Sequence, residues 1–368
     1  MNVSTPSESS SPVVPVRGLK KWVGAAGVIA ALMLVGGRLA LEPLREIPHF
    51  DDRSMDAYSA VERFGLREGD PTSEIAFFGS SQTVWGIIPK VVAAGVGEEP
   101  AHIHNLGLPS GTPFDMWNLV RRNPQRFEKL RLAVVEVNPT MLSQNREEDP
   151  RLKFSMSQHA TLAQRLMIKH RPARMEMVAE WGVPLLSIRQ NLRSVFLNVL
   201  QPEPGNPIYS FVDQRRFPAA DWHCGVEGQL RARHLVPPDV AARRMIGKGV
   251  WRLSELQNDA MHRLLAWLEE RKIPVFIHQF PLHPEVVRVI AEEPDVARCY
   301  KQYSSYVESL RPHAASMHRI LDPAECGATA EGMADRMHLN EIGAGFYSMY
   351  LAEKIQPFAL PDPGKREG

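Results

Sequence analysis

After residue 72, short apolar segments alternate with helical patterns, and this alternation leaves few possible folds. Five segments have the length and apolar content of buried strands, and two helical patterns follow the third and the fifth of them. Short apolar strands separated by helices predict an α/β fold, with helices on both faces of a parallel sheet. The predicted strands are Ile75–Phe78, Ile103–Leu106, Leu132–Val137, Pro274–Gln279 and Met317–Leu321, and the helices are Ser254–Arg271 and Ile342–Ile355.

Residues 145–250 break this rhythm. The segment is basic and helical at first, then amphipathic, then rich in proline and glycine. We interpret it as a large insertion between the third and fourth strands. Its basic residues stand beside leucine and valine, which suits either a helical lid packed on the sheet or a surface that lies on anionic lipid. The lid is the favoured interpretation; the basic residues are Lys169, Arg171, Arg174, Arg189 and Arg193.

The N-terminal 41 residues have the pattern of a membrane anchor. Residues 1–21 are predicted to be a disordered cytoplasmic tail, and residues 22–41 form an apolar run interrupted by Arg38 alone. Arg17, Lys20 and Lys21 precede the run, so the positive-inside rule places everything after it outside the cytoplasm. A cleaved signal peptide and a buried core helix are the alternatives. We expect residues 42–72 to be a connector, 73–356 the α/β domain and 357–368 a tail.

Charge and motif content argue against several classes of ligand. Lys plus Arg is 43 and Asp plus Glu is 42, a balance that gives no reason to expect nucleic acid as a partner. The three cysteines show no C-x-x-C spacing, and the chain has neither a Walker nor a Rossmann glycine pattern. His102 and His104 alternate along one strand without a carboxylate at ligand spacing. We therefore expect no metal and no cofactor.

A serine stands where the first predicted strand ends. Ile75–Phe78 leads into Gly79, Ser80, Ser81 and Gln82, and such a turn exposes a hydroxyl at the carboxyl edge of the sheet, where open α/β folds bind ligands. A helix starting after Ser81 would aim its N–H groups at a developing oxyanion. The alternative interpretation is a simple turn with a helix N-cap.

An aspartate and a histidine close to the C-terminus complete a possible catalytic set. A nucleophilic serine needs a base, and the base needs an orienting carboxylate; Asp335 and His338 can supply both from a loop ahead of the last helix. Asn340 is a plausible N-cap of that helix. Asp259 and His262 have the same spacing, but they lie within the amphipathic helix Ser254–Arg271, where solvent exposure explains them.

Two further residues follow the second and third predicted strands. The N–H of Gly107 and the side-chain amide of Asn138 are candidates for an oxyanion hole. Gly107 is equally compatible with a plain turn, and Asn138 before Pro139 with an ordinary strand end.

Together these pieces resemble the SGNH/GDSL hydrolase family, over residues 74–140 and 253–356. The resemblance implies a three-layer flavodoxin-like sheet, with Ser81 as nucleophile, Gly107 and Asn138 as oxyanion ligands, and Asp335 with His338 as the terminal pair. Ser80 stands where the family has aspartate, and Glu136-Val-Asn-Pro stands where it has Gly-x-Asn-Asp. The first departure is similar to membrane-anchored members such as the alginate acetylation proteins and the D-alanyl transfer protein of teichoic acid.

The resemblance implies an enzyme of the bacterial cytoplasmic membrane, single-pass, with its domain in the periplasm or otherwise extracytoplasmic. It would transfer or hydrolyse O-acyl groups of a cell-envelope polysaccharide through an acyl-serine, with a membrane-bound O-acyltransferase as a possible partner. The alternatives are an esterase or lipase-like hydrolase of small esters, and a non-catalytic polysaccharide assembly protein that keeps the fold.

Overall fold

The computed structural model describes residues 74–183, 186, 236–247 and 249–359, and the isolated residues 28 and 36. The predicted cytoplasmic tail, almost all of the predicted anchor, the connector and residues 360–368 lie outside the described residues. Within the described part, no helix has both the length and the apolar character needed to cross a membrane. The last helix continues to Ala359, so the predicted tail from residue 357 begins too early.

A five-stranded, all-parallel sheet forms the centre of the molecule, in the order β2-β1-β3-β4-β5. This confirms the predicted α/β fold and is consistent with a flavodoxin-like three-layer arrangement. The predicted strand bounds are off by at most two residues at either end. The strands are β1 Ile75–Gly79, β2 Ile103–Gly107, β3 Leu132–Glu136, β4 Val275–Gln279 and β5 Ser316–Arg319.

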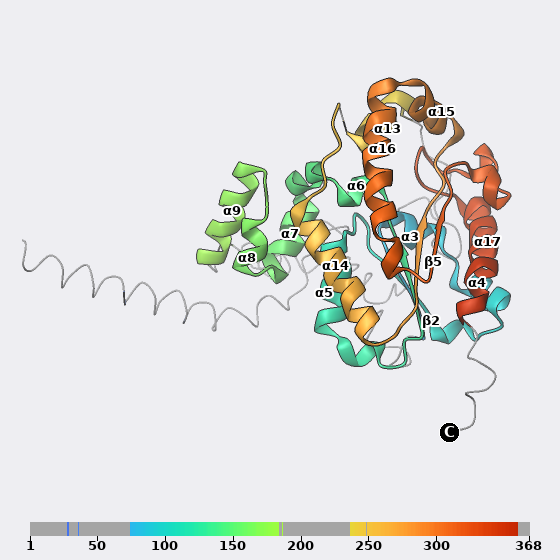
Figure 1. Cartoon of the computed structure of the whole chain (residues 1–368), viewed down its shortest axis with the longest axis horizontal. Helices are drawn as coiled ribbons and strands as arrows, with labels where there is room; N and C mark the ends of the chain where they lie inside the picture. Colours follow the sequence, from blue (N-terminus) through green and yellow to red (C-terminus); the bar gives the residue numbers. More distant parts are fainter. Residues whose placement is uncertain are drawn as a thin grey trace, which may run out of the picture.

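Each central strand is apolar on both faces because both faces are covered. In β1, Ile75 and Phe77 join one core cluster with residues of α4 and α17, whereas Ala76 and Phe78 join the other with residues of α5 and α14. This division follows the two-residue repeat of a strand, which sends neighbouring side chains to opposite faces. Figure 1 shows the resulting layers, with α4 and α17 on one side of the sheet and α5, α14 and α16 on the other.

The helices that cover the sheet follow from amphipathic segments and short caps. Thr112 and Asp115 form a capping box at the start of α5, and Pro occupies the first turn of several others. The helices outside the β3–β4 connection are α3 Ser81–Gly86, α4 Pro89–Val96, α5 Pro113–Arg122, α14 Glu255–Glu270, α15 Pro284–Glu292, α16 Pro294–Ser309 and α17 Glu341–Ala359. Short 3-10 turns are η2 Pro100–His102, η3 Pro124–Phe127, η5 Arg311–His313, η6 Pro323–Cys326 and η7 Ala330–Gly332.

The described part of the long β3–β4 connection is helical. Side chains of α7 and α9, with Ile168 between α8 and α9, form a small core of their own against Phe114 and the start of α14. Arg165 is fully buried there and donates to the carbonyls of Met156, Ser157 and Met177, so it joins the three helices. The elements are α6 Pro139–Leu142, η4 Gln144–Glu148, α7 Pro150–His159, α8 Leu162–Leu166, α9 Arg171–Gly182 and α13 Pro238–Ile246.

The strand order places a topological switch point between β1 and β3. From β1 the chain crosses to β2 on one side, and from β3 it continues to β4 on the other. The loops that leave two such strands diverge, which opens a crevice at their carboxyl ends. Ser81 follows β1 and Asn138 follows β3, so both predicted site residues lie at this crevice.

Candidate active site

Ser81 is the first residue of α3, directly after the turn that leaves β1. Ser80 is the N-cap, and its hydroxyl accepts a hydrogen bond from the N–H of Gln82. The N–H of Thr83 donates to the side chain of Glu136. Among the described residues, none accepts a hydrogen bond from the N–H of Ser81, which therefore stays available at the same place as the Ser81 hydroxyl.

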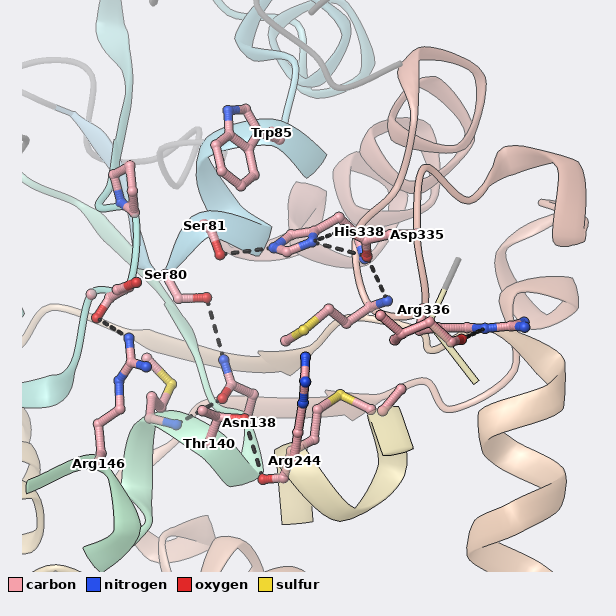
Figure 2. A pocket seen from close by; sticks show the side chains of 18 residues that line it. Ser80, Ser81, Trp85, Asn138, Thr140, Arg146, Arg244, Asp335, Arg336 and His338 are labelled. Atoms are coloured by element: carbon pink, nitrogen blue, oxygen red, sulfur yellow. Dashed lines mark hydrogen bonds and ion pairs between the residues drawn. The ribbon is translucent and has the colours of Figure 1, made fainter. Parts of the chain in front are cut away.

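The Ser81 hydroxyl, the His338 ring and the Asp335 carboxylate form one hydrogen-bonded chain (Figure 2). The distance from Ser81 Oγ to His338 Nε2 is 2.8 Å. His338 Nδ1 lies 2.8 Å from Asp335 Oδ2 and 3.0 Å from Oδ1. The structure thus brings together a serine near the start of the domain and a pair near its end. The geometry is that of a nucleophile, its base and the group that orients the base.

The Asp335 carboxylate is fixed by its own loop. Its Oδ1 accepts the N–H groups of Met337 and His338, both at 2.9 Å. Burial alone would raise the pKa of this carboxyl. The hydrogen bond and charge of His338, together with the two backbone N–H groups, outweigh burial and lower the pKa from its usual value of 3.8. Asp335 therefore remains ionised at any pH where a histidine acts as a base.

Two side chains that the sequence did not single out hold the histidine loop against α3. Trp85 lies edge-on to the His338 ring, with 5.1 Å between ring centroids. Gln82 Nε2 donates to the carbonyl of Met337. Both residues lie one turn or less from Ser81 on α3, so the helix that carries the nucleophile also sets the position of the base.

Asn138 lies at the site as predicted. Its side-chain oxygen caps α6 by accepting the N–H of Met141, and its Nδ2 is 2.5 Å from Glu136 Oε1 and 3.3 Å from Ser80 Oγ. The amide has two hydrogens, of which Glu136 takes one at short range. The second faces Ser80 at a longer distance, at the wall of the cavity that Asn138 lines. Its role as an oxyanion ligand stays a prediction.

Gly107 does not reach the site in the predicted way. Its N–H donates to Asn105 Oδ1 at 3.0 Å, and it is not among the residues that line the cavity. Instead it makes room for α3, because a Cβ atom there would lie 2.6 Å from the N of Val84 and 2.9 Å from Thr83 Cβ. The fold needs glycine at this position for packing, and its N–H is not available as the predicted oxyanion ligand.

A cavity of about 550 Å³ opens beside Ser81 and His338. One part of its wall is apolar, from Trp85, Met141, Met245 and Met337. Three arginines also line it, and two of them have anionic partners: Arg146 pairs with Asp149, and Arg336 with Glu285.

Arg244 is the third of these arginines. It is exposed on α13, extends toward the space below Ser81 and His338 (Figure 2), and its guanidinium has no partner among the described residues. The connection between β3 and β4 thus supplies part of the cavity wall and a positive charge, which no local motif had indicated.

Two further histidines, His102 and His278, lie outside the candidate catalytic set. Glu74, Glu98 and His102 come within 4.8 Å of one another, so carboxylates do approach His102, contrary to the sequence-based expectation. Arg131 pairs with both carboxylates, at 2.9 and 2.6 Å, and offsets one of their two negative charges. His278 is fully buried on β4, where its Nδ1 bonds the hydroxyl of Tyr347 at 2.8 Å, while its Nε2 has no hydrogen-bond partner among the described residues.

No family model matches the chain, and the search of curated proteins gave no match either. The resemblance to the SGNH/GDSL pattern therefore rests on the motif residues and on their geometry in the fold.

Proposed function

We propose that this chain is an extracytoplasmic serine acyltransferase or esterase that acts on O-acyl groups of a cell-envelope polysaccharide through an acyl-serine. The observation that carries the proposal is the chain Ser81–His338–Asp335, with both distances at 2.8 Å, at the edge of a cavity large enough for a ligand. The Ser81 N–H beside the hydroxyl adds a donor for a developing negative charge, which a purely structural hydrogen-bonded network does not need.

The proposed mechanism uses the residues as the geometry presents them. His338 Nε2 takes the proton from Ser81 Oγ as the oxygen attacks an ester carbonyl, and Asp335 stabilises the imidazolium that forms. The oxyanion is bound by the Ser81 N–H and the Asn138 amide. The intermediate collapses to an acyl-Ser81 ester, and the leaving alcohol receives the proton from His338. A sugar hydroxyl or water then attacks this ester, and His338 acts as base again.

The acceptor and the location are inferred from the resemblance rather than from the geometry. The proposal includes a polysaccharide acceptor, an anchor in the bacterial cytoplasmic membrane, and a membrane-bound O-acyltransferase that delivers the acyl group. The last of these is needed because acyl-CoA is not expected outside the cytoplasm.

The proposal is tested by incubating the full-length chain with p-nitrophenyl acetate, beside Ser81→Ala and His338→Ala. We expect release of nitrophenol by the parent and a loss of at least about 10³-fold in kcat in both variants. Ser305→Ala, on the exposed face of α16, is a matched serine control that keeps the parent's rate. A fluorophosphonate probe should modify the parent at Ser81 only. Parent activity that persists in Ser81→Ala, or a parent that neither turns over nor reacts with the probe, would exclude this function.

The same protein distinguishes transfer from hydrolysis. With an acyl donor and an envelope polysaccharide present, a transferase forms acylated polysaccharide faster than free acid, and an esterase gives free acid alone. Both products depend on Ser81, so the ratio reports what reaches the acyl-serine.

A further inference from the structure

The carboxylate of Glu136 is a buried hub behind the candidate nucleophile. Glu136 ends β3 and is fully buried. It accepts five hydrogen bonds: from Ser80 N at 2.7 Å and Ser80 Oγ at 2.6 Å, from Thr83 N at 3.2 Å and Thr83 Oγ1 at 2.6 Å, and from Asn138 Nδ2 at 2.5 Å. No Lys or Arg pairs with it in the described part of the chain, so neutral donors alone offset the cost of burying this group.

These donors lie on both sides of Ser81. Ser80 comes immediately before it, and Thr83 two residues after it, so the carboxylate is hydrogen-bonded to the turn on both sides of the candidate nucleophile. The fifth donor, the Asn138 amide, lies only two residues after Glu136, at the N-cap of α6. One side chain thus joins the turn of the candidate nucleophile to the candidate oxyanion ligand.

The turn sequence is adapted to this carboxylate. β1 and β3 are adjacent and in register up to Phe78 and Val135, which places Gly79 beside Glu136. A Cβ atom at Gly79 would clash with both Glu136 Oε2 and Thr83 Oγ1. Glycine is therefore required at position 79 because the carboxylate fills the space where a side chain would stand.

We propose that Glu136 is a positioning residue, which holds the Ser81 turn and the Asn138 amide in their catalytic relation. This inference rests on the proposed function. Glu136 itself does not line the cavity, whereas Ser80, Ser81 and Asn138 do. It acts through Ser80, Thr83 and Asn138, which donate the five hydrogen bonds. A change at Glu136 should therefore affect the reactivity of Ser81 more than the binding of a substrate.

Glu136→Gln tests this in the full-length chain. The amide keeps the size of the side chain but turns one acceptor into a donor that faces N–H or O–H groups. We expect the rate of Ser81 modification by a fluorophosphonate, and kcat for p-nitrophenyl acetate, to fall together by about 10- to 100-fold, with KM changed less than about threefold.

Glu147→Gln is the matched control. Glu147 is also a buried carboxylate with several donors, namely the N–H groups of Lys169 and His170 and the hydroxyl of Ser254, but it does not line the cavity. It should lose thermal stability while its probe reaction stays within about twofold of the parent. Equal losses of reactivity in both variants would overturn the positioning role, because they would reflect general destabilisation.

Two substitutions at Thr83 test the same inference if the Glu136→Gln variant does not fold. Thr83→Val removes one donor to Glu136 without changing shape, and Thr83→Ser retains it. We expect the Thr83→Val variant to react with the probe several-fold more slowly than the parent, and the Thr83→Ser variant to react at about the parent's rate. A parent that does not react with the probe disproves the proposed function. If the parent reacts with the probe, and the Glu136→Gln and Thr83→Val variants react as fast as the parent, this inference alone is disproved.

Discussion

The Nδ1 atom of His338 lies 2.8 Å from Asp335 Oδ2, although the same three-residue spacing at Asp259 and His262 gives a different result. On the helix α14, Asp259 pairs with Arg263 at 2.7 Å, and the His262 ring packs edge-on against His313. The loop before α17 instead folds back so that Asp335 accepts two backbone N–H groups and faces the ring. Loop conformation, and not spacing, makes the pair.

Asp335→Asn should lower kcat by about 10³- to 10⁴-fold, because the amide no longer holds the imidazole tautomer or stabilises the imidazolium. Steady-state hydrolysis of p-nitrophenyl acetate measures this. The matched control is Asp259→Asn, which removes the half-buried partner of Arg263 and should leave kcat unchanged. An Asp335→Asn protein with at least a tenth of the parent rate would contradict the assigned role.

Asn138→Ala should reduce kcat by about 10²- to 10³-fold if its amide binds the oxyanion. The same change removes the N-cap of α6, which costs about 1 kcal/mol of stability. Ser143→Ala removes another side-chain cap, at η4, without touching the cavity, and provides the comparison for stability. A similar small rate effect in both variants would show that Asn138 only caps its helix.

Gly107→Ala should destabilise the fold by about 1–3 kcal/mol and lower the rate at which Ser81 reacts. The new methyl group would lie 2.6 Å from the backbone of α3, which carries Ser81. Gly345→Ala is the opposite case, since no atom lies within 4 Å of a Cβ there and the residue is inside α17. It should stabilise the fold by up to about 1 kcal/mol. Chemical denaturation compares the two variants, and a neutral Gly107→Ala would show that α3 can shift freely.

Arg244→Met should weaken binding of anionic esters relative to neutral ones, because Arg244 presents a charge to the cavity without a partner in the described residues. The guanidinium is exposed, so we expect KM for p-nitrophenyl hemisuccinate to rise about fivefold, equivalent to about 1 kcal/mol, with KM for the acetate unchanged. Arg243→Met, on the same helix but paired with Asp295 and Glu293, is the control. Equal changes for both esters would remove Arg244 from charge recognition.

His278 should make the fold sensitive to acid. Burial lowers its pKa from 6.5 to about 3. Between these values the unfolded chain binds a proton that the folded chain does not, so stability is complete above pH 6.5 and declines as the pH falls toward 3. The contribution approaches about 1.4 kcal/mol per pH unit in the middle of that window.

The variant His278→Asn keeps a hydrogen-bonding group beside the Tyr347 hydroxyl and removes the titrating group. Its free energy of unfolding, measured by denaturant titration at pH 7, 6 and 5, should fall less steeply than that of the parent. Parallel slopes for the two proteins would mean that His278 binds its proton equally in the folded and unfolded chains over this pH range.

Local sequence patterns were sufficient for the elements that carry the site. All five strands were predicted within two residues, because strands buried on both faces are continuous apolar runs bounded by polar turns. Ser81, Asp335, His338 and Asn138 were selected because each follows a strand or precedes the last helix. Trp85, Arg244 and Glu136 had no such mark: Trp85 resembles a core residue, Arg244 a surface charge and Glu136 an ordinary strand end.

Local patterns in the chain are enough to predict the parallel sheet, the order of its strands along the chain and the residue types at their carboxyl ends. Which of these groups meet depends on how the chain packs in three dimensions. This packing joins Ser81 to His338 across 257 positions, turns the Gly107 N–H to Asn105 and buries Glu136 among five donors. Periodicity and turn chemistry act between neighbours in the chain, whereas hydrogen bonds in the site join loops whose directions are set by packing of the whole sheet.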